Sequence, residues 1–244
     1  PDMLTFSPDG TRVLVANEAE TSATGGGPNP AGSVSILTVD VSGGPGAFVA
    51  PVSTDTADFT AIAATLSATT GDSTKTSARI NPNAPTIAQD IEPEYVVIGG
   101  DSKTAYVTLQ ENNAIGVLDV QTNTITHILP LGVKDHSKAD SGFIGYTGLV
   151  NSSNKLDASD RDLDGTDGDI QIKNWNNIYG MYMPDAIAIY EVNGRTYVLT
   201  ANEGDSRDPA DFPGYGDEGS LRSLTSNSSF DSTVRENINA GRLT

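Results

Sequence analysis

Cysteine is absent from this sequence of 244 residues, and histidine occurs only twice. The absence of cysteine excludes disulfides, thiol catalysis and cysteine-ligated zinc. Two histidines argue against a histidine-rich zinc or iron centre. The sequence also lacks any run of about 18 apolar residues, so we expect no segment that spans a membrane directly.

Basic residues are scarce as well. The chain has 14 lysines and arginines against 32 aspartates and glutamates, which gives a formal net charge of −18. A phosphate backbone would be repelled by such a surface, so we expect no nucleic-acid partner. Strong acidity suits calcium-rich or salty surroundings, where cations screen the repulsion between carboxylates. The simpler explanation, that the charge only confers solubility, stays open.

The composition that is present favours strands and turns. Hydrophobic residues make up 36% of the chain and gather in strand-sized runs, which distinguishes it from a disordered sequence. Glycine occurs 25 times and proline 13 times, as expected of a fold with many tight turns.

Three stretches of the chain resemble one another. Each has a proline followed by an acidic residue, an alternating strand, a tight turn and a more apolar strand that ends in Asn or Gln followed by Glu. These repeats span residues 1–18, 93–111 and 184–203, with turns at Asp9-Gly10, Asp101-Ser102 and Asn193-Gly194. Third strands are expected at 33–39 and 114–120, and a fourth at 124–129.

Repeated four-stranded antiparallel units are typical of the blades of a β-propeller, and a flat β-sandwich is the alternative. We therefore predict an all-β chain that forms a partial β-propeller of two to three four-stranded blades with long loop insertions. Within residues 1–244, the blade-like units are 1–40, 92–132 and 184–203, and the insertions are 41–91, 133–183 and 204–240.

The chain is expected to be a fragment of a larger propeller, because two to three blades cannot close a ring of the usual ~4–8. Pro1 opens a repeat that is expected to be already under way, and Gly241–Thr244 resembles the approach to another strand. The expected partners are the remainder of the parent chain or other copies.

The sharpest local motif lies in the second insertion. Asp160-x-Asp162-x-Asp164-Gly165 resembles the start of a calcium loop, in which alternate carboxylates converge on one hard cation. Gln171 stands where an EF-hand requires Glu, so we expect a calcium loop of another kind, or else a solvated acidic turn. The predicted calcium ligands are Asp157, Asp160, Asp162, Asp164, Asp167 and Asp169.

Polar residues recur where the second strand of each repeat ends. In a propeller such strand ends would ring one face, near the central channel. They predict a ligand site or second metal site, with Glu18, Glu203, Asp205 and Arg207 as its residues. A structural role, in which these residues cap turns and exposed backbone, is the alternative.

Two further groups of residues favour packing over chemistry. His136 follows Asp135, but no nucleophile motif accompanies the pair, so we expect a histidine that stabilises a loop. An aromatic and methionine cluster runs from Trp175 to Met183. It could line a sugar or peptide groove, although packing of the insertion onto its blade is the favoured interpretation.

Several stretches resemble the choice-of-anchor I family. They are 92–95, 106–114, 156–160, 172–175, 179–186 and 200–205. This resemblance implies a large bacterial extracellular protein with YVTN-like propeller repeats, attached to the surface by a C-terminal signal. Some relatives are labelled alkaline phosphatase-like, and animal members are called mesenchyme-specific cell-surface glycoproteins. No catalytic residue is carried over from the family.

The favoured function is an extracellular or cell-surface scaffold for adhesion or assembly that binds calcium and contacts surface or matrix components. This hypothesis rests on the repeats, the acidity and the absence of a nucleophile motif. The alternative is a calcium-dependent phosphoesterase, in which carboxylate-bound metal would polarise a phosphoryl oxygen and activate water. Arg207 would then clamp the phosphate.

Overall fold

A computed structural model of the chain describes residues 1–19, 30–44, 51–66, 78–82, 84–137, 154–157, 170, 172–176 and 178–207. The chain divides into two compact units. The first unit combines Pro1–Gly132 with Tyr182–Gly216, and the second combines Val133–Met181 with Asp217–Thr244. The described parts are all-β apart from two short helices, and none of these helices has the length and apolar character needed to cross a membrane.

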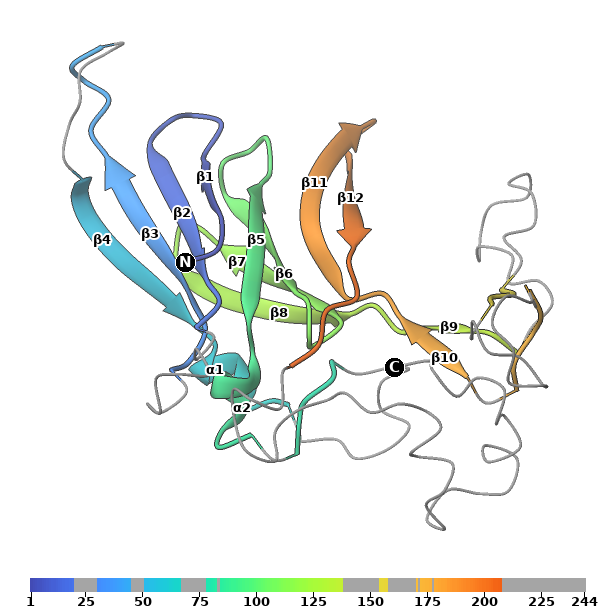
Figure 1. Cartoon of the computed structure of the whole chain (residues 1–244). Coiled ribbons are helices and arrows are strands. Elements are labelled where there is room, and N and C mark those ends of the chain that lie inside the picture. Colours follow the sequence, from blue (N-terminus) through green and yellow to red (C-terminus); the bar gives the residue numbers. More distant parts are fainter. Residues whose placement is uncertain are drawn as a thin grey trace. The chain divides into compact units, whose positions relative to one another are not determined.

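The first sheet is a four-stranded antiparallel meander. Its strands lie in the order β1-β2-β3-β4, and the first two form the predicted hairpin (Figure 1). The strands are β1 (Leu4–Phe6), β2 (Arg12–Asn17), β3 (Ser33–Val39) and β4 (Pro51–Asp58). The position of β4 extends this sheet beyond the predicted unit 1–40, into the stretch 41–91 that was expected to be an insertion.

The second sheet repeats this topology in the order β5-β6-β7-β8, with all four strands where the repeat predicts them. They are β5 (Pro93–Ile98), β6 (Thr104–Leu109), β7 (Ala114–Asp119) and β8 (Thr124–Pro130). The proline-acid pair thus starts a strand, as expected, because the first residue of a strand can dispense with a backbone donor.

The third sheet has two strands, β11 (Pro184–Val192) and β12 (Arg195–Asn202), which correspond to the first two strands of the other sheets. The correspondence extends to irregularities in strand pairing. The register shifts between Pro93 and Val96 in β5, and between Pro184 and Ile187 in β11. Such a shift turns the side chains at the start of a strand in a new direction, and here it affects the acidic residue that follows each proline.

The hairpin turns follow the predicted pattern. Backbone φ is positive at Gly10, Ser102 and Asn193, which tight turns between antiparallel strands require. The turns of neighbouring sheets also touch. The Asp9 amide donates to Ser102 Oγ at 3.2 Å, and the Gly100 amide donates to Glu191 Oε1 at 3.3 Å.

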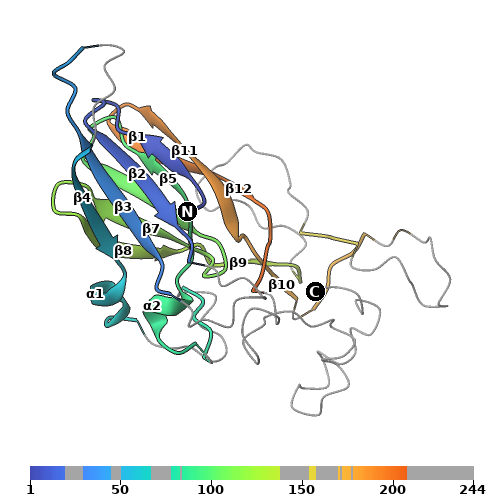
Figure 2. The same ribbon diagram turned by 60° about the vertical axis from the view of Figure 1, so that its left-hand side comes forward.

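The three sheets of the first unit lie face to face, with the second in the middle (Figure 1 and Figure 2). β5 contacts β1 and β2 on one side and β11 on the other. The arrangement of open sheets is compatible with successive propeller blades.

The main hydrophobic core fills the space between the first two sheets. Phe59 follows β4 and packs over Gly116 of β7, where a Cβ would meet its ring at 3.5 Å. The first sheet contributes Leu14, Ala16, Val34, Ile36 and Ala57, and the second contributes Val96, Ile98, Ala105, Val107, Leu109 and Leu118. Each large aliphatic side chain fully buried here contributes about 1.5–3 kcal/mol.

Two single-turn helices lie beside this core, α1 (Thr60–Ala63) and α2 (Ile87–Asp90). Thr86 caps α2, since its side chain accepts a hydrogen bond from the Gln89 amide. α2 ends at Asp90, which has no exposed surface, and the chain continues through buried Ile91 into β5. The helix therefore places Asp90 beside the start of the second sheet.

The second unit contains a small sheet in which β9 (Val133–Asp135) pairs with β10 (Tyr179–Met181). His136 directly follows β9, and its backbone amide donates to the Ile178 carbonyl at 3.0 Å. Its Nδ1 lies 2.6 Å from the Asn154 carbonyl oxygen, and its own carbonyl accepts from the Trp175 amide at 2.9 Å. Trp175 is buried, and Lys173 Nζ lies 4.2 Å from the centroid of its ring. These contacts support the structural role predicted for His136.

Candidate functional site

Acidic residues occupy equivalent positions at the start of three neighbouring strands. Asp2 lies two residues before the first residue of β1, Glu94 is the second residue of β5, and Asp185 is the second residue of β11. Each follows a proline of the repeat. Because β5 contacts both β1 and β11, these carboxylates lie at the same end of adjacent sheets.

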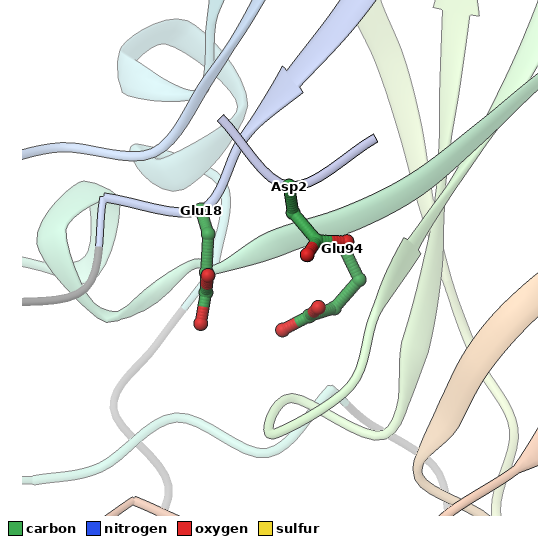
Figure 3. A group of neighbouring side chains, drawn as sticks. All are labelled: Asp2, Glu18 and Glu94. Carbon is green, nitrogen blue, oxygen red and sulfur yellow. The ribbon is translucent and has the colours of Figure 1, made fainter. Parts of the chain in front are cut away.

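Three carboxylates from the first two sheets gather into one group, which we call the acidic cluster: Asp2, Glu18 and Glu94. One carboxylate oxygen of each lies within 4.8 Å of the others. Figure 3 shows the side chains approaching from three separate segments of the backbone. Asp2 is exposed, Glu18 is half-buried and Glu94 is buried, so the cluster extends from the surface inward.

Burial and neighbouring charge both act on Glu94. Its side chain is only 8% exposed, and desolvation is the main reason that its pKa rises to about 9. The charges of Glu111, Glu18, Asp2 and Asp185 add to this increase in pKa. Glu94 therefore holds a proton at neutral pH unless a positive charge enters the cluster.

Glu111 belongs to the buried turn between β6 and β7 and extends the acidic region inward. It is 6% exposed, and its Oε2 has no hydrogen-bond partner among the described residues. Desolvation raises the pKa of Glu111 to about 7, against the opposing effects of its own backbone amide and of Arg207. The charges of Glu18 and Asp205 raise this pKa further.

Arg207 is buried beneath this region and is already paired. Its Nη2 lies 3.2 Å from Asp90 Oδ1 and its Nε lies 3.4 Å from Glu92 Oε2. Nη2 also donates to the Asp90 carbonyl at 2.6 Å. Burial raises the pKa of Glu92, and the guanidinium opposes that shift. Arg207 is 4% exposed and is engaged by these partners, so the structure lends no support to its predicted role as a phosphate clamp.

Asn112 fixes the position of Asp90. Its Nδ2 donates to Asp90 Oδ2 at 3.0 Å, to the Asp90 carbonyl at 3.1 Å and to the Arg79 carbonyl at 2.9 Å. The Asn81 amide donates to the same Asp90 carboxylate oxygen at 3.1 Å. A buried polar layer around Asp90 therefore links α2, the start of β5 and the β6–β7 turn.

The remaining residues predicted for this site are not members of the acidic cluster. Glu203 and Asp205 are exposed after the end of β12, and Asp205 Oδ1 accepts from the Ser206 amide at 2.8 Å. Of the four residues predicted for a ligand or second metal site, Glu18 belongs to the acidic cluster and Arg207 pairs with Asp90 and Glu92.

The predicted calcium loop has only one residue in the described part of the chain. Asp157 is exposed there, whereas Asp160, Asp162, Asp164, Asp167 and Asp169 lie outside the described residues. The aromatic cluster is partly described. Trp175 and Ile178 are buried, while Tyr179 and Met181 have exposed fractions of 40% and 37%.

Sequence reasoning missed Asp2, Glu94 and Glu111 as site residues, although the repeat contained a signal that could have identified them. The proline-acid pair was interpreted only as the start of a strand. When the first two repeats are stacked, however, the residues after their prolines, Asp2 and Glu94, fall beside Glu18, which follows the second strand of the first repeat. Carboxylate oxygens brought together in this way suit a hard divalent cation.

Comparison with known proteins agrees with the family resemblance of the sequence motifs. A family model described as the choice-of-anchor I domain matches residues 1–244. A search of curated proteins finds no match to the chain.

Proposed function

The chain belongs to the choice-of-anchor I family, and from this premise we propose that it is a cell-surface scaffold for adhesion or assembly built from stacked sheets. The family implies a secreted protein anchored at the surface. The acidic, cysteine-free composition agrees with an extracellular setting in a bacterium. The finer proposal is that the open sheets are propeller blades that receive further blades of the same repeat.

The observation that carries this proposal is the contrast between the middle sheet and its two neighbours. The second sheet is covered on both faces, so that Val107 on one face and Thr108 on the other have no exposed surface. The outward face of the first sheet leaves Leu4 and Phe6 57% and 63% exposed. Burial of such apolar surface is the main favourable term in association.

The third sheet has an equivalent exposed face. Tyr190, Tyr197 and Leu199 are 57%, 46% and 53% exposed, and the two tyrosine rings lie 6.2 Å apart. Within the described residues, β12 pairs only with β11, whereas its counterparts β2 and β6 each have a strand on both sides. An open strand edge beside an apolar face is a template for another strand.

This surface fits a further sheet of the same repeat. The second sheet already packs between two such sheets, and a further sheet would pack on the third sheet in the same way. That sheet would come from the remainder of the parent protein or from another copy. Calcium binding by the loop that contains Asp160, Asp162 and Asp164 stays part of this proposal.

The phosphoesterase alternative finds no support at Arg207, its expected phosphate clamp, because Asp90 and Glu92 engage the guanidinium. The scaffold proposal requires no catalytic group and draws on the exposed faces of the outer sheets.

Size-exclusion chromatography with light scattering tests the scaffold proposal. We expect the chain to self-associate with increasing concentration, and Leu199→Asp to reduce that association. Thr196→Asp is the matched control, since it adds the same charge to an exposed position of the same strand. A monomer at every concentration, with one sharp cooperative unfolding transition, would contradict the proposal.

A further inference from the structure

The acidic cluster brings the carboxylates of Asp2, Glu18 and Glu94 within 4.8 Å of one another. Neither Asp2 nor Glu94 has an ion pair or a side-chain hydrogen bond with any residue that the structure describes. Exposed acidic groups often gather at a surface with no ligand, but Glu94 is 8% exposed. A buried carboxylate without a partner is unfavourable, because it has lost water and gained nothing in exchange.

A second observation comes from a different element. Glu111, in the turn after β6, has a buried Oε2 with no hydrogen-bond partner among the described residues. Among neighbouring charges, that of Glu111 has the largest effect on the pKa of Glu94, so the two carboxylates are near neighbours. A native protein rarely leaves a buried oxygen unsatisfied without a ligand, ion or water to receive.

From this geometry we propose that Asp2, Glu18 and Glu94 bind a calcium ion, with Glu111 as an additional carboxylate on the buried side. The residues come from the segment before β1, the end of β2, the start of β5 and the turn after β6. The ion would therefore connect the first sheet to the second. This site is separate from the calcium loop predicted at 157–169.

The ligand set favours calcium among the divalent cations. Calcium accepts six to eight oxygen ligands in flexible geometry, about 2.3–2.6 Å away, whereas magnesium demands a near-ideal octahedron and retains several waters. Carboxylates on four separate segments, with unequal burial, suit the less demanding ion. Asp2 is exposed and leaves room for water on the outer side.

A bound cation would also explain why, within the described residues, Asp2 and Glu94 lack the counter-charge that the buried polar layer around Asp90 has. There Asp90 and Glu92 have Arg207 as their counter-charge, with distances of 3.2 and 3.4 Å. The acidic cluster has no such arginine within hydrogen-bonding distance of Asp2 or Glu94. A bound ion would supply the missing positive charge.

Isothermal titration calorimetry with calcium chloride, after removal of metals with EDTA, tests the proposal on the whole chain. The calcium loop is first inactivated by Asp160→Asn, Asp162→Asn and Asp164→Asn together, so that only the acidic cluster can respond. We expect this loop variant to retain one calcium equivalent per chain. Adding Glu94→Gln should raise the Kd at least about tenfold, the lower limit seen when even an outer-shell partner of a metal is lost.

The matched control is Glu203→Gln in the loop variant, which we expect to leave the Kd unchanged. Glu203 ends the second strand of its repeat as Glu18 does, but it is exposed and outside the acidic cluster. Glu18→Gln, at a half-buried position, provides a second test should Glu94→Gln unfold, which circular dichroism will show.

Three results would overturn the proposal. The loop variant could bind no calcium at millimolar concentration. Glu94→Gln or Glu18→Gln, correctly folded, could bind calcium as tightly as the loop variant. Magnesium could bind the loop variant as tightly as calcium.

Discussion

Arg207 Nη2 lies 3.2 Å from Asp90 Oδ1, and the two side chains are 2% and 0% exposed. They are 117 residues apart in sequence, yet their opposite charges meet in the buried polar layer around Asp90. Removing one partner of a buried ion pair leaves the other as an uncompensated charge, which is far more costly than the pair itself is favourable.

The first prediction concerns this pair. Arg207→Ala should lower the free energy of unfolding by about 3–5 kcal/mol, because Asp90 and Glu92 stay buried without their partner. Arg195→Ala, at an exposed position of β12, should change it by less than about 0.5 kcal/mol. Urea unfolding followed by circular dichroism measures both. Equal, small effects would mean that the pairing does not persist in solution.

The second prediction concerns the contact between the second and third sheets. The Thr108 hydroxyl donates to the Asp185 carbonyl at 2.7 Å and accepts from the Tyr95 amide at 2.9 Å. Thr108→Val keeps the shape but removes the partner of those two half-buried backbone groups, so it should cost about 1–3 kcal/mol.

Thr104→Val on the same strand is the control, since the Thr104 side chain makes no hydrogen bond in the described part of the structure and should change stability little. The measurement is thermal unfolding, with hydrogen exchange of β11 as a local readout. A Thr108→Val chain as stable as the control would show that the third sheet does not depend on this contact.

The third prediction concerns pH. Burial raises the pKa of Glu94 to about 9 and that of Glu111 to about 7, from an ordinary value of 4.5. Between those limits the folded chain holds protons that the unfolded chain has lost, so stability falls as pH rises. In the presence of EDTA, the chain should therefore be most stable near pH 5 and less stable at each step towards pH 9.

Glu94→Gln isolates the contribution of one carboxylate to this trend. It removes the charge while retaining the shape, so the melting temperature should depend less steeply on pH between 5 and 9. Glu203→Gln, exposed and outside the cluster, should leave the slope unchanged. A melting temperature that rises with pH over this range in EDTA would contradict the assigned burial of these groups.

The repeat made the hairpins and most of the strands predictable. Turn residues such as Gly10 and Asn193 can be recognised locally. β7 has the apolar run of a buried strand, and β8 alternates polar with apolar residues. β4 did not, because its sequence PVSTDTAD is polar and, among its described side chains, only Ala57 is buried. An outer strand carries little of the pattern on which such predictions depend.

The site was less predictable than the fold, because its partners are remote in sequence. Glu18 was identified from its place at a strand end. Arg207 looked like a free cation in an acidic loop, since nothing local indicates that Asp90 and Glu92 enclose it. The convergence of Asp2 with Glu94 depends on how two sheets stack, which the sequence of either sheet alone does not specify.

Hydrogen exchange tests the central claim, that the third sheet receives another sheet of the same repeat. The comparison is between β12 (Arg195–Asn202) and β6 (Thr104–Leu109). In the chain by itself, at a dilution where light scattering shows a monomer, β12 amides should exchange at least about a hundredfold faster than those of β6. Within the intact parent protein or the assembled form, β12 should become protected. Equal protection of β12 and β6 in the dilute monomer would contradict the account, because the third sheet would then be complete without another unit.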